Sequence, residues 1–484
     1  KPIEELAREL GLNPAEIIKL ASNENPLGPS EKALEAARQA LSELCLYPDG
    51  NGFNLKQALS KRLNVGMDQI TLGNGSNDVL EVITRCFADA DSEVVFSQYA
   101  FAVYPLVTQA IGAKGVSVPA REWGHDLDAM AEAVTDRTRL VFVANPNNPT
   151  GTVHTAEAIE SFLKKIPENV LVVLDEAYCE YLTGDQYPDG VELLDRFPNL
   201  IVCRTFSKAW GLAALRVGYS ISSPAIADIL NRVRQPFNVD TVALSAATAV
   251  LEDEEYLQRS RDVNTAGLRQ LQDAFDRMGL SYIPSAGNFV AVEVGEQAMG
   301  VYQSLLAHGV IVRPIAGYGM PRHLRVSVGL PEENERFIEA LADSGSVKRA
   351  AHAVNMTPEG AYLLRRHPKG HEFRAAWEAA LALGVQRLED VAMERAIHGV
   401  EVPVYHFGQI VGTRRVYNDR LLMFLLRNRA PERFAADGAK ALSAVDQALL
   451  ARLKREWSRM GSRTGGDGRA QRGRDLCEHQ PEAE

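Results

Sequence analysis

Residues 170–178 read VLVVLDEAY, a run of five apolar residues followed by two carboxylates, an alanine and a tyrosine. The apolar run lacks alternation, which is typical of a strand that crossover helices bury on both faces. Similar short runs alternate with helical patterns along this part of the chain, and the other strand candidates are 69–72, 93–96, 115–118, 140–143, 200–203 and 217–220. This alternation predicts an α/β fold built on a mainly parallel, doubly wound sheet.

The pattern changes after residue 250. A long helical stretch at 252–278 precedes shorter strand candidates and a final helix, at 288–293, 310–312, 324–328 and 331–341. This order predicts a smaller α+β lobe. We therefore expect residues 26–250 to form a large domain, and residues 1–25 together with 251–342 to form a small domain.

Composition excludes several classes of protein. The chain has 484 residues, a formal net charge of -11 and 46% hydrophobic residues, which is the profile of a soluble globular protein. No run of about 18 apolar residues occurs, so a membrane-spanning helix is not expected, and the first residues lack a signal-peptide pattern. The five cysteines are odd in number and widely spaced, which argues against a disulfide framework and a metal cluster. We expect a cytoplasmic protein with no metal site.

Charge divides the chain near residue 345. Residues 346–484 contain 23 Lys and Arg against 17 Asp and Glu, whereas residues 1–345 contain 29 against 46. Arg-rich helical patterns joined by a tight turn predict a mainly α-helical helix-turn-helix module over 345–435, with a hairpin candidate at 402–416. Residues 459–484 have few apolar side chains, which predicts a disordered tail.

The module at 345–435 resembles small bacterial and phage-related helix-turn-helix proteins, some of them likened to terminase small subunits. The function of those proteins is poorly defined, but the helix-turn-helix layout itself favours DNA binding by its second helix, and the positive charge balance permits contacts with phosphates. Helix-turn-helix patterns also arise in ordinary helical bundles, so DNA binding and a purely structural role both stay open.

Polar residues follow the predicted strands at places where packing alone would not select them. The four segments are 73–78 (GNGSND), 145–151 (NPNNPTG), 175–178 (DEAY) and 205–208 (TFSK), with Arg216 farther along. Ligands of α/β sheets bind at the carboxyl ends of strands, so we expect these segments to converge. The glycine-rich turn offers free backbone N–H groups to an anion, and the lysine offers an amine nucleophile. The alternative interpretations are that the glycine-rich segment is a plain turn and that the lysine is a surface cation.

In this order the four segments resemble the fold type I pyridoxal-phosphate aminotransferases, over residues 1–342. In detail they are similar to the histidinol-phosphate aminotransferase family. The matching stretches are ASNENP (21–26), YPDG (47–50), YAFAVY (99–104), FSKAWGLAALRVGY (206–219) and LRVSVG (324–329). The resemblance implies a large domain with a mixed, doubly wound sheet, pyridoxal 5′-phosphate as cofactor, amino and keto acid substrates, and a homodimer.

The resemblance also implies roles for matching residues. Lys208 would form the Schiff base with the cofactor and later move a proton, and Asp175 would pair with the pyridinium nitrogen. Tyr178 and Asn148 would bind the ring 3-oxygen, and Phe101 would stack on the ring, although Phe101 could equally be a core residue. The remaining cofactor-binding residues are Gly75, Ser76, Asn77, Thr205, Ser207 and Arg216, together with the partner subunit's Tyr47.

On the substrate side, Arg325 would hold the α-carboxylate through two hydrogen bonds. Arg313 is a candidate for binding the substrate phosphate or 2-oxoglutarate, and an ordinary surface arginine is the alternative. Asn23 joins the substrate-binding set. Members of the family carry an N-terminal arm upstream of the segment that begins this sequence, so we expect cofactor binding here with weaker substrate affinity and dimer association.

The expected reaction converts histidinol phosphate and 2-oxoglutarate into imidazole-acetol phosphate and glutamate. Two enzymes of the same fold remain alternatives, an aromatic aminotransferase and a phospho-amino-acid decarboxylase. An alternative from another class is a DNA-binding regulator that uses an aminotransferase-like part as sensor or dimerisation domain. The full set of catalytic residues and the negative charge of residues 1–345 argue against that alternative.

Overall fold

The computed structural model describes residues 3–343, 400–406 and 409–416. Residues 3–343 belong to one compact unit, and the segments 400–406 and 409–416 belong to another. Most of the module predicted at 345–435, and the whole tail predicted at 459–484, lie outside the described residues.

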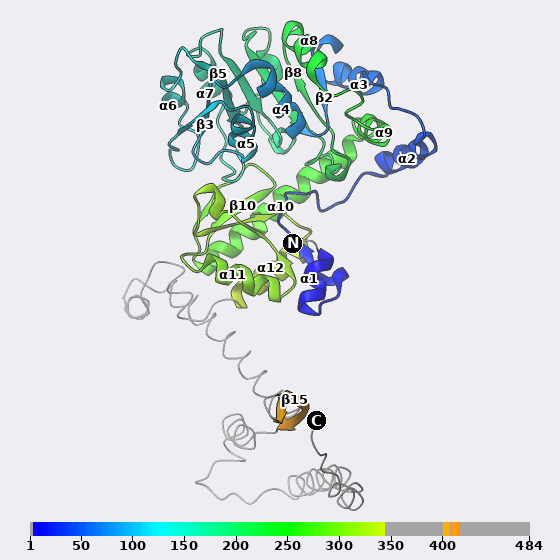
Figure 1. The fold of residues 1–484 in the computed structure, drawn as a ribbon, viewed down its shortest axis with the longest axis vertical. Coiled ribbons are helices and arrows are strands. Elements are labelled where there is room, and N and C mark those ends of the chain that lie inside the picture. The colour runs from blue at the N-terminus through cyan, green and yellow to red at the C-terminus, as the bar shows by residue number, and fades with distance from the viewer. Residues whose placement is uncertain (1–2, 344–399, 407–408, 417–484) are drawn as a thin grey trace, which may run out of the picture. The chain divides into compact units, whose positions relative to one another are not determined.

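A seven-stranded sheet forms the centre of the large domain, in the order β2-β8-β7-β6-β5-β3-β4 (Figure 1). The strands are β2 (Ile70–Gly73), β3 (Glu93–Ser97), β4 (Lys114–Val118), β5 (Thr138–Ala144), β6 (Leu171–Asp175), β7 (Leu200–Thr205) and β8 (Gly218–Ile221). The five strands from β7 to β4 are parallel, while β8 is antiparallel to both of its neighbours. The seven strand candidates and the mainly parallel sheet are therefore confirmed.

Helices cover both faces of this sheet, which explains the missing alternation in its strands. In β6, Val172 and Leu174 belong to one buried cluster and Val173 to another. The first cluster includes side chains of α2 (Glu31–Ala40), α3 (Phe53–Leu63), α6 (Leu127–Glu132), α7 (Ala156–Leu163) and α9 (Thr241–Val250). The second includes side chains of α4 (Ser76–Phe87), α5 (Val103–Ala110) and α8 (Pro224–Val233).

The smaller lobe contains a four-stranded antiparallel sheet in the order β12-β13-β10-β9. Its elements are β9 (Tyr282–Ile283), β10 (Phe289–Glu293), α11 (Ala298–Ala307), β11 (Val310–Ile311), β12 (Arg313–Pro314), β13 (His323–Ser327) and α12 (Pro331–Asp343). The N-terminal segment joins this lobe, because β1 (Ile18–Lys19) pairs with β11 and α1 (Ile3–Leu10) packs beside it. The expected domain limits at residues 26 and 251 stay predictions.

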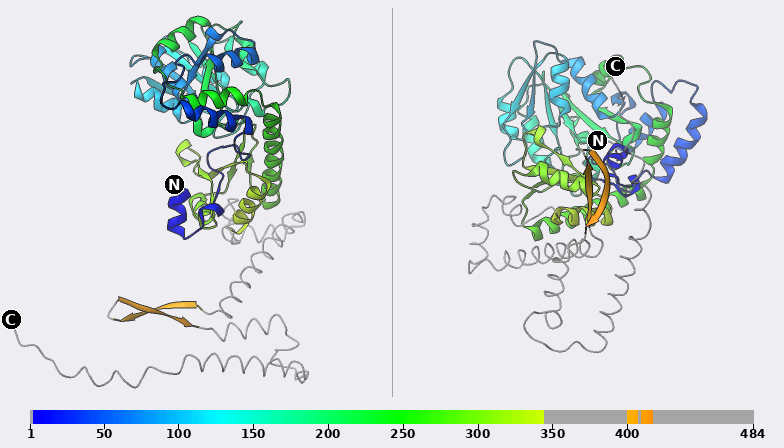
Figure 2. Two further views of the ribbon diagram at one scale, coloured as in Figure 1. Left: turned by 90° about the vertical axis from the view of Figure 1, so that its right-hand side faces the viewer. Right: turned by 60° about the horizontal axis from the view of Figure 1, so that its bottom comes forward.

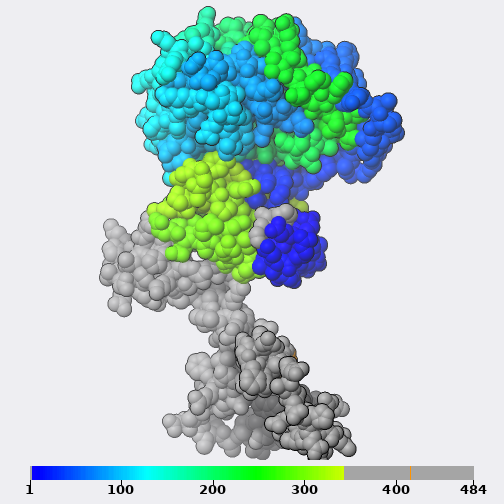
Figure 3. All heavy atoms as spheres, viewed as in Figure 1, coloured from blue at the N-terminus to red at the C-terminus, as the bar shows by residue number. Residues whose placement is uncertain are grey.

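One long helix, α10 (Glu254–Met278), connects the two lobes (Figure 2). Tyr256 and Leu257 at its start are buried in the large-domain core. Leu271 and Phe275, farther along, are buried in the core of the small lobe. Atoms of the two lobes lie directly against each other in Figure 3, so residues of the small lobe can reach a site at the edge of the large sheet.

In the second unit, β14 (Val400–His406) and β15 (Gln409–Val416) form an antiparallel hairpin with an irregularity between Val404 and Tyr405. The hairpin predicted at 402–416 is therefore confirmed, whereas the helices predicted around it are not among the described residues. Across the described ranges, no helix is long and apolar enough to cross a membrane.

Candidate active site

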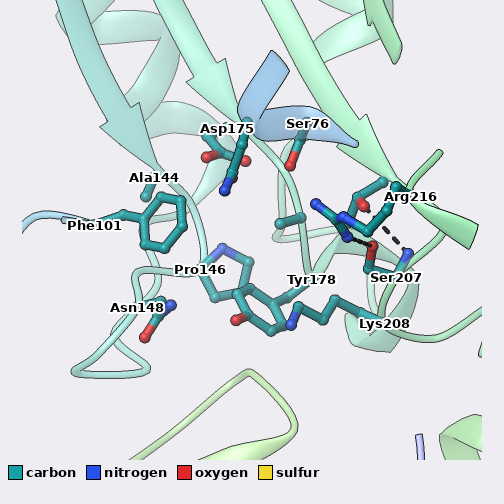
Figure 4. Close-up of a pocket in the computed structure, with 13 residues that line it drawn as sticks. Ser76, Phe101, Ala144, Pro146, Asn148, Asp175, Tyr178, Ser207, Lys208 and Arg216 are labelled. Atoms are coloured by element: carbon teal, nitrogen blue, oxygen red, sulfur yellow. Dashed lines mark hydrogen bonds between the residues drawn. The ribbon is translucent and has the colours of Figure 1, made fainter. Parts of the chain in front are cut away.

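A cavity of about 150 Å³ lies at the carboxyl ends of β5, β6 and β7 (Figure 4). It is lined by Ser76, Asn77, Phe101, Ala144, Pro146, Asn148, Asp175, Ala177, Tyr178, Thr205, Ser207, Lys208 and Arg216. All four polar segments of the sequence contribute to this lining, so their predicted convergence is confirmed. The parallel strands bring the segments together because they all end at the same edge of the sheet.

Asp175 ends β6 and is almost completely buried, with 5% of its surface exposed. The hydroxyl of Tyr104 donates a hydrogen bond to Asp175 Oδ2 over 2.8 Å. Oδ1 of the same carboxyl is buried and has no hydrogen-bond partner among the described residues. Burial raises the pKa of Asp175 to about 6. A buried carboxylate with one unpaired oxygen is costly, so this position is suited to a ligand that donates a proton or a positive charge.

Lys208 follows β7 and extends toward Tyr178 (Figure 4). Its Nζ donates a hydrogen bond to the backbone carbonyl of Ser22 over 3.2 Å and lies 5.8 Å from the centre of the Tyr178 ring. Burial and, to a smaller extent, the positive charge of Arg325 together lower the pKa of Lys208 to about 8. An amine with a pKa this close to neutrality is partly unprotonated under ordinary conditions, which suits a nucleophile or a proton acceptor.

An anion-binding corner forms where α4 begins. Ser76, Ser207 and Arg216 lie together on one side of the cavity, and Phe101 and Asn148 lie on the other (Figure 4). Arg216 Nη1 donates hydrogen bonds to Ser207 Oγ over 3.2 Å and to the Ala213 carbonyl over 3.1 Å. The free N–H groups of a helix N-terminus, a hydroxyl and a guanidinium together favour an anion such as phosphate.

Glycine is required at two points of this corner. Gly75 has a φ of 80°, and a Cβ atom there would lie 2.3 Å from Arg216 Nη2. A Cβ atom on Gly218 would lie 2.3 Å from the backbone nitrogen of Ser76. Any side chain at either position would therefore push the cationic group or the helix N-terminus away from an anion.

Two arginines of the small lobe share a contact with the Ala21 carbonyl, and one of them, Arg325, also contacts a residue that lines the cavity. Arg325 on β13 donates hydrogen bonds from Nη1 to Asn148 Oδ1 over 2.5 Å and from Nη2 to the Ala21 carbonyl over 2.8 Å. Arg313 pairs with Arg325 across β12 and β13, and its Nε donates to the same Ala21 carbonyl over 3.4 Å. Arg325 is buried and Arg313 is exposed, so the two guanidinium groups differ in how strongly water competes for them.

Asn23 holds Tyr178 in place and is not itself part of the cavity lining. Its Nδ2 donates a hydrogen bond to the Tyr178 hydroxyl over 2.9 Å, and its Oδ1 accepts one from Ser327 Oγ over 2.9 Å. Asn23 is 1% exposed and has a φ of 55°. Its side-chain oxygen and nitrogen are thus both occupied by protein groups, and its substrate-binding role stays a prediction.

Tyr47 does not line the cavity of its own chain. Its side chain is 84% exposed, and its ring stacks on Phe237 with centroids 4.9 Å apart. Neighbouring apolar side chains are also exposed, namely Leu41, Leu44, Leu46 and Phe53. An exposed apolar surface of this kind is typical of a protein interface, so the predicted contribution of the partner subunit's Tyr47 stays a proposal.

The sequence did not single out several residues that shape the site. Tyr104 lies within the quoted YAFAVY stretch, and a tyrosine in the first turn of a buried helix was a signal, because its hydroxyl needs a partner. Ser22 contributes only a backbone carbonyl, and Ser327 acts through Asn23. Neither has a sequence signal of its own.

The chain is similar to proteins of known kind over this part of its length. A family model described as aminotransferase class I and II matches residues 15–341. Histidinol-phosphate aminotransferase 2 of Pseudomonas aeruginosa is 62% identical over 341 residues, which are 70% of this chain and 92% of that protein. Histidinol-phosphate aminotransferase 1 of Nitrosococcus oceani is 58% identical, with the same coverage of 70% and 92%.

A solved structure gives the same likeness. The crystal structure of a histidinol-phosphate aminotransferase from Sinorhizobium meliloti in complex with pyridoxal-5′-phosphate has a TM-score of 0.67 and 33% identity. The matched region covers 71% of this chain and 94% of the Sinorhizobium meliloti chain. The family match ends at residue 341 and thus does not include the module predicted at 345–435.

Proposed function

The chain belongs to the class I and II aminotransferase family, and on this premise we propose that it is a histidinol-phosphate aminotransferase with pyridoxal 5′-phosphate as cofactor. It transfers the amino group of histidinol phosphate to 2-oxoglutarate and yields imidazole-acetol phosphate and glutamate. The observation that carries the proposal is the buried Asp175, which has an unpaired Oδ1 and lines the same cavity as the low-pKa Lys208. The choice of substrate rests on the 62% identical relative.

The residues of the cavity fit this cofactor. The unpaired Asp175 Oδ1 matches a protonated ring nitrogen, and the corner at Ser76, Ser207 and Arg216 matches the phosphate. Glycine at positions 75 and 218 lets Arg216 and the start of α4 lie close to that corner, because a side chain at either position would collide with them. When bound, the cofactor supplies a protonated aromatic ring that withdraws electron density from the substrate Cα.

The other cofactor contacts follow from the same lining. Phe101 provides an apolar face for the ring, while Tyr178 and Asn148 offer a hydroxyl and an amide to the ring oxygen. Asn77 and Thr205 complete the polar lining. Each of these roles is a proposal that substitution can test.

The protein's own groups divide the remaining work. Lys208 Nζ accepts the proton from the substrate Cα and returns it on the other side of the transferred amino group, for which a pKa of about 8 is well suited. Arg325 binds the anionic end of each substrate in turn, since histidinol phosphate carries a phosphate where glutamate carries its α-carboxylate. Arg313 donates a hydrogen bond to the same Ala21 carbonyl as Arg325. We propose that it helps Arg325 to neutralise the negative charge of the bound substrate.

The proposed assembly is a homodimer in which the partner subunit's Tyr47 reaches the cofactor phosphate. Its support is the 84% exposure of Tyr47 within an exposed apolar surface. As a biosynthetic enzyme the protein would act in the cytoplasm.

A separate proposal, DNA binding by residues 345–435, rests on the charge balance and the helix-turn-helix pattern. Binding of the full chain to mixed-sequence duplex DNA across a salt series tests it, and no binding at low salt would refute it.

Substrate choice can be tested with the full chain loaded with pyridoxal 5′-phosphate. The absorbance band of the bound cofactor is followed after addition of histidinol phosphate, phenylalanine or glutamate, each without a keto acid. We expect histidinol phosphate and glutamate to deplete the band, and phenylalanine to act much more slowly. Lys208→Ala is the control that should not react. A band that phenylalanine depletes faster than histidinol phosphate would identify an aromatic aminotransferase.

A further inference from the structure

Asp175 receives a hydrogen bond from a residue that the proposed mechanism does not use. The Tyr104 hydroxyl donates to Asp175 Oδ2 over 2.8 Å, and Tyr104 is 0% exposed. Because no water reaches this hydroxyl, the bond cannot be replaced by solvent when it is lost. The occupied Oδ2 and the unpaired Oδ1 make the two oxygens of one carboxyl chemically distinct.

The Tyr104 ring is held firmly in this orientation. It stacks on Phe142 with centroids 4.5 Å apart and an interplanar angle of 3°. Its other neighbour is Phe101, which meets it edge to face at 5.8 Å and also lines the cavity. Thr108 Oγ1, one helical turn farther along α5, donates to the Tyr104 carbonyl over 2.7 Å. The hydroxyl is thus fixed by packing on the ring and by the helix that carries it.

Resting on the function proposed above, we propose that Tyr104 is a positioning residue for transamination. Its hydrogen bond to Oδ2 directs Oδ1 of Asp175 toward the ring nitrogen of the cofactor and keeps the carboxyl ionised. With the carboxyl ionised, the proton stays on the ring nitrogen, where electron withdrawal from the substrate needs it. Tyr104 would also tie the orientation of Asp175 to that of Phe101, because its ring touches both.

Opposing influences act on the charge of Asp175. Burial raises its pKa, and the hydrogen bond from Tyr104 is the largest of the influences that lower it. The other titratable groups near this carboxyl are Cys203 on β7 and, around the cavity, Lys208 and Tyr178. Removal of the Tyr104 hydroxyl would therefore raise the pKa of Asp175 and draw the shared proton from the ring nitrogen toward the carboxyl.

The test compares three variants of the full chain. Tyr104→Phe removes the hydroxyl and keeps the stacked ring. Site-specific replacement of Tyr104 by 3,5-difluorotyrosine makes the hydroxyl a stronger donor with little change in shape. Tyr256→Phe is the matched control, because Tyr256 is also buried and its hydroxyl donates to the Gly28 carbonyl over 2.5 Å, away from the cavity.

The first measurement uses the cofactor-free protein and needs no activity. Aspartate labelled with ¹³C at the carboxyl is titrated by NMR, and the Asp175→Asn spectrum identifies the Asp175 signal. We expect Tyr104→Phe to raise the Asp175 pKa by about 1 unit, as loss of one hydrogen bond to a carboxylate implies. Difluorotyrosine should lower the pKa, and Tyr256→Phe should leave it unchanged.

The second measurement uses the loaded enzyme. Tyr104→Phe should lower kcat about tenfold and leave the KM for histidinol phosphate unchanged, because Tyr104 is not among the residues that line the cavity. The inference would be overturned if the Asp175 pKa were unchanged in Tyr104→Phe. It would also be overturned if both Tyr104 variants shifted the Asp175 pKa in the same direction. Failure of the wild-type chain to react with histidinol phosphate would refute the proposed function instead, and the titration of the cofactor-free protein separates the two results.

Discussion

Two adjacent carboxylates at the end of β6 belong to opposite faces of the central sheet and have opposite surroundings. Glu176 is 1% exposed, and both its oxygens are paired: Oε1 accepts from the Gly190 N–H over 2.8 Å, and Oε2 accepts two bonds from Arg204 at 2.9 and 2.7 Å. Asp175 is nearly as buried, at 5% exposed, but only its Oδ2 has a hydrogen bond of good geometry, from Tyr104. The nearby Ala177 N–H lowers the pKa of this carboxyl without pairing Oδ1 in that way. Burial raises the pKa of both carboxyls to about 6.

The difference teaches how a structural acid can be told from a functional one. Burial and a raised pKa are shared by both residues and do not discriminate between them. What separates them is whether the protein supplies every hydrogen-bond partner itself. Glu176 finds all its partners within the protein, whereas Asp175 leaves one oxygen unpaired and also lines the cavity. Glu180 Oε2 is likewise buried and unpaired but does not line the cavity, so an unpaired oxygen marks a ligand site only where a cavity adjoins it.

The largest expected effect is on catalysis. Asp175→Asn should lower kcat/KM roughly a thousandfold, because an amide cannot hold the ring proton by charge. Glu176→Gln should leave the activity of the folded enzyme within about threefold of wild type, since Glu176 does not line the cavity. Steady-state assays on both variants test the comparison, and similar losses in the two would remove the distinction between the faces.

The second effect is on the free energy of unfolding. Here we expect the larger change at Glu176 and the smaller one at Asp175. Glu176→Gln should reduce the free energy of unfolding by about 4 kcal/mol, because Arg204 would lose its buried counter-charge. Asp175→Asn should not destabilise the cofactor-free protein, because it removes a buried charge that is only half paired. Urea unfolding of the two cofactor-free variants gives both values. A stable Glu176→Gln protein would mean that Asp189, which also pairs with Arg204 at 2.6 Å, carries the charge balance alone.

A third effect follows from the raised pKa of Asp175. A carboxyl with a pKa of about 6 in the folded state and 3.8 as its ordinary value stabilises the fold below about pH 4. This contribution is lost as the pH rises through 6, and amounts to about 3 kcal/mol. The stability of cofactor-free wild type relative to Asp175→Asn should therefore fall between pH 4 and pH 6. A difference that stays constant over this range would show that the carboxyl has an ordinary pKa.

The smallest expected effect concerns the small lobe. Arg325→Lys should raise the KM for both histidinol phosphate and glutamate about tenfold, since an ammonium cannot reproduce the two-pronged contact of a guanidinium. Arg313→Lys serves as the matched control on the neighbouring strand and should change KM less, because Arg313 is exposed. A larger effect at Arg313 would reverse the roles proposed for the two arginines.

The sequence predicted those parts of the fold that depend on burial. The strands of the large sheet were recognisable because residues such as Val172 and Val173 are buried on opposite faces and both must be apolar. Pairing direction has no such signature, so the antiparallel β8 could not be distinguished from its parallel neighbours. The two-residue strands β1 and β9 are too short for any periodicity.

The site was predictable where a side chain acts at a strand end and through a residue type that packing does not favour. Asp175, Lys208 and Arg216 are such residues, and they line one cavity. Tyr104 was not identified because the sequence shows only that its buried hydroxyl needs a partner, not which residue that partner is. Its importance depends on a bond to a residue 71 positions away, which only the fold can reveal.

The central claim is that Asp175 is left half paired in order to hold a protonated ring nitrogen. The most direct test loads the full chain with pyridoxal 5′-phosphate labelled with ¹⁵N in the ring and records the nitrogen chemical shift at neutral pH. We expect a protonated nitrogen in wild type and in Glu176→Gln, and an unprotonated one in Asp175→Asn. An unprotonated nitrogen in wild type, or a protonated one that survives Asp175→Asn, would contradict it.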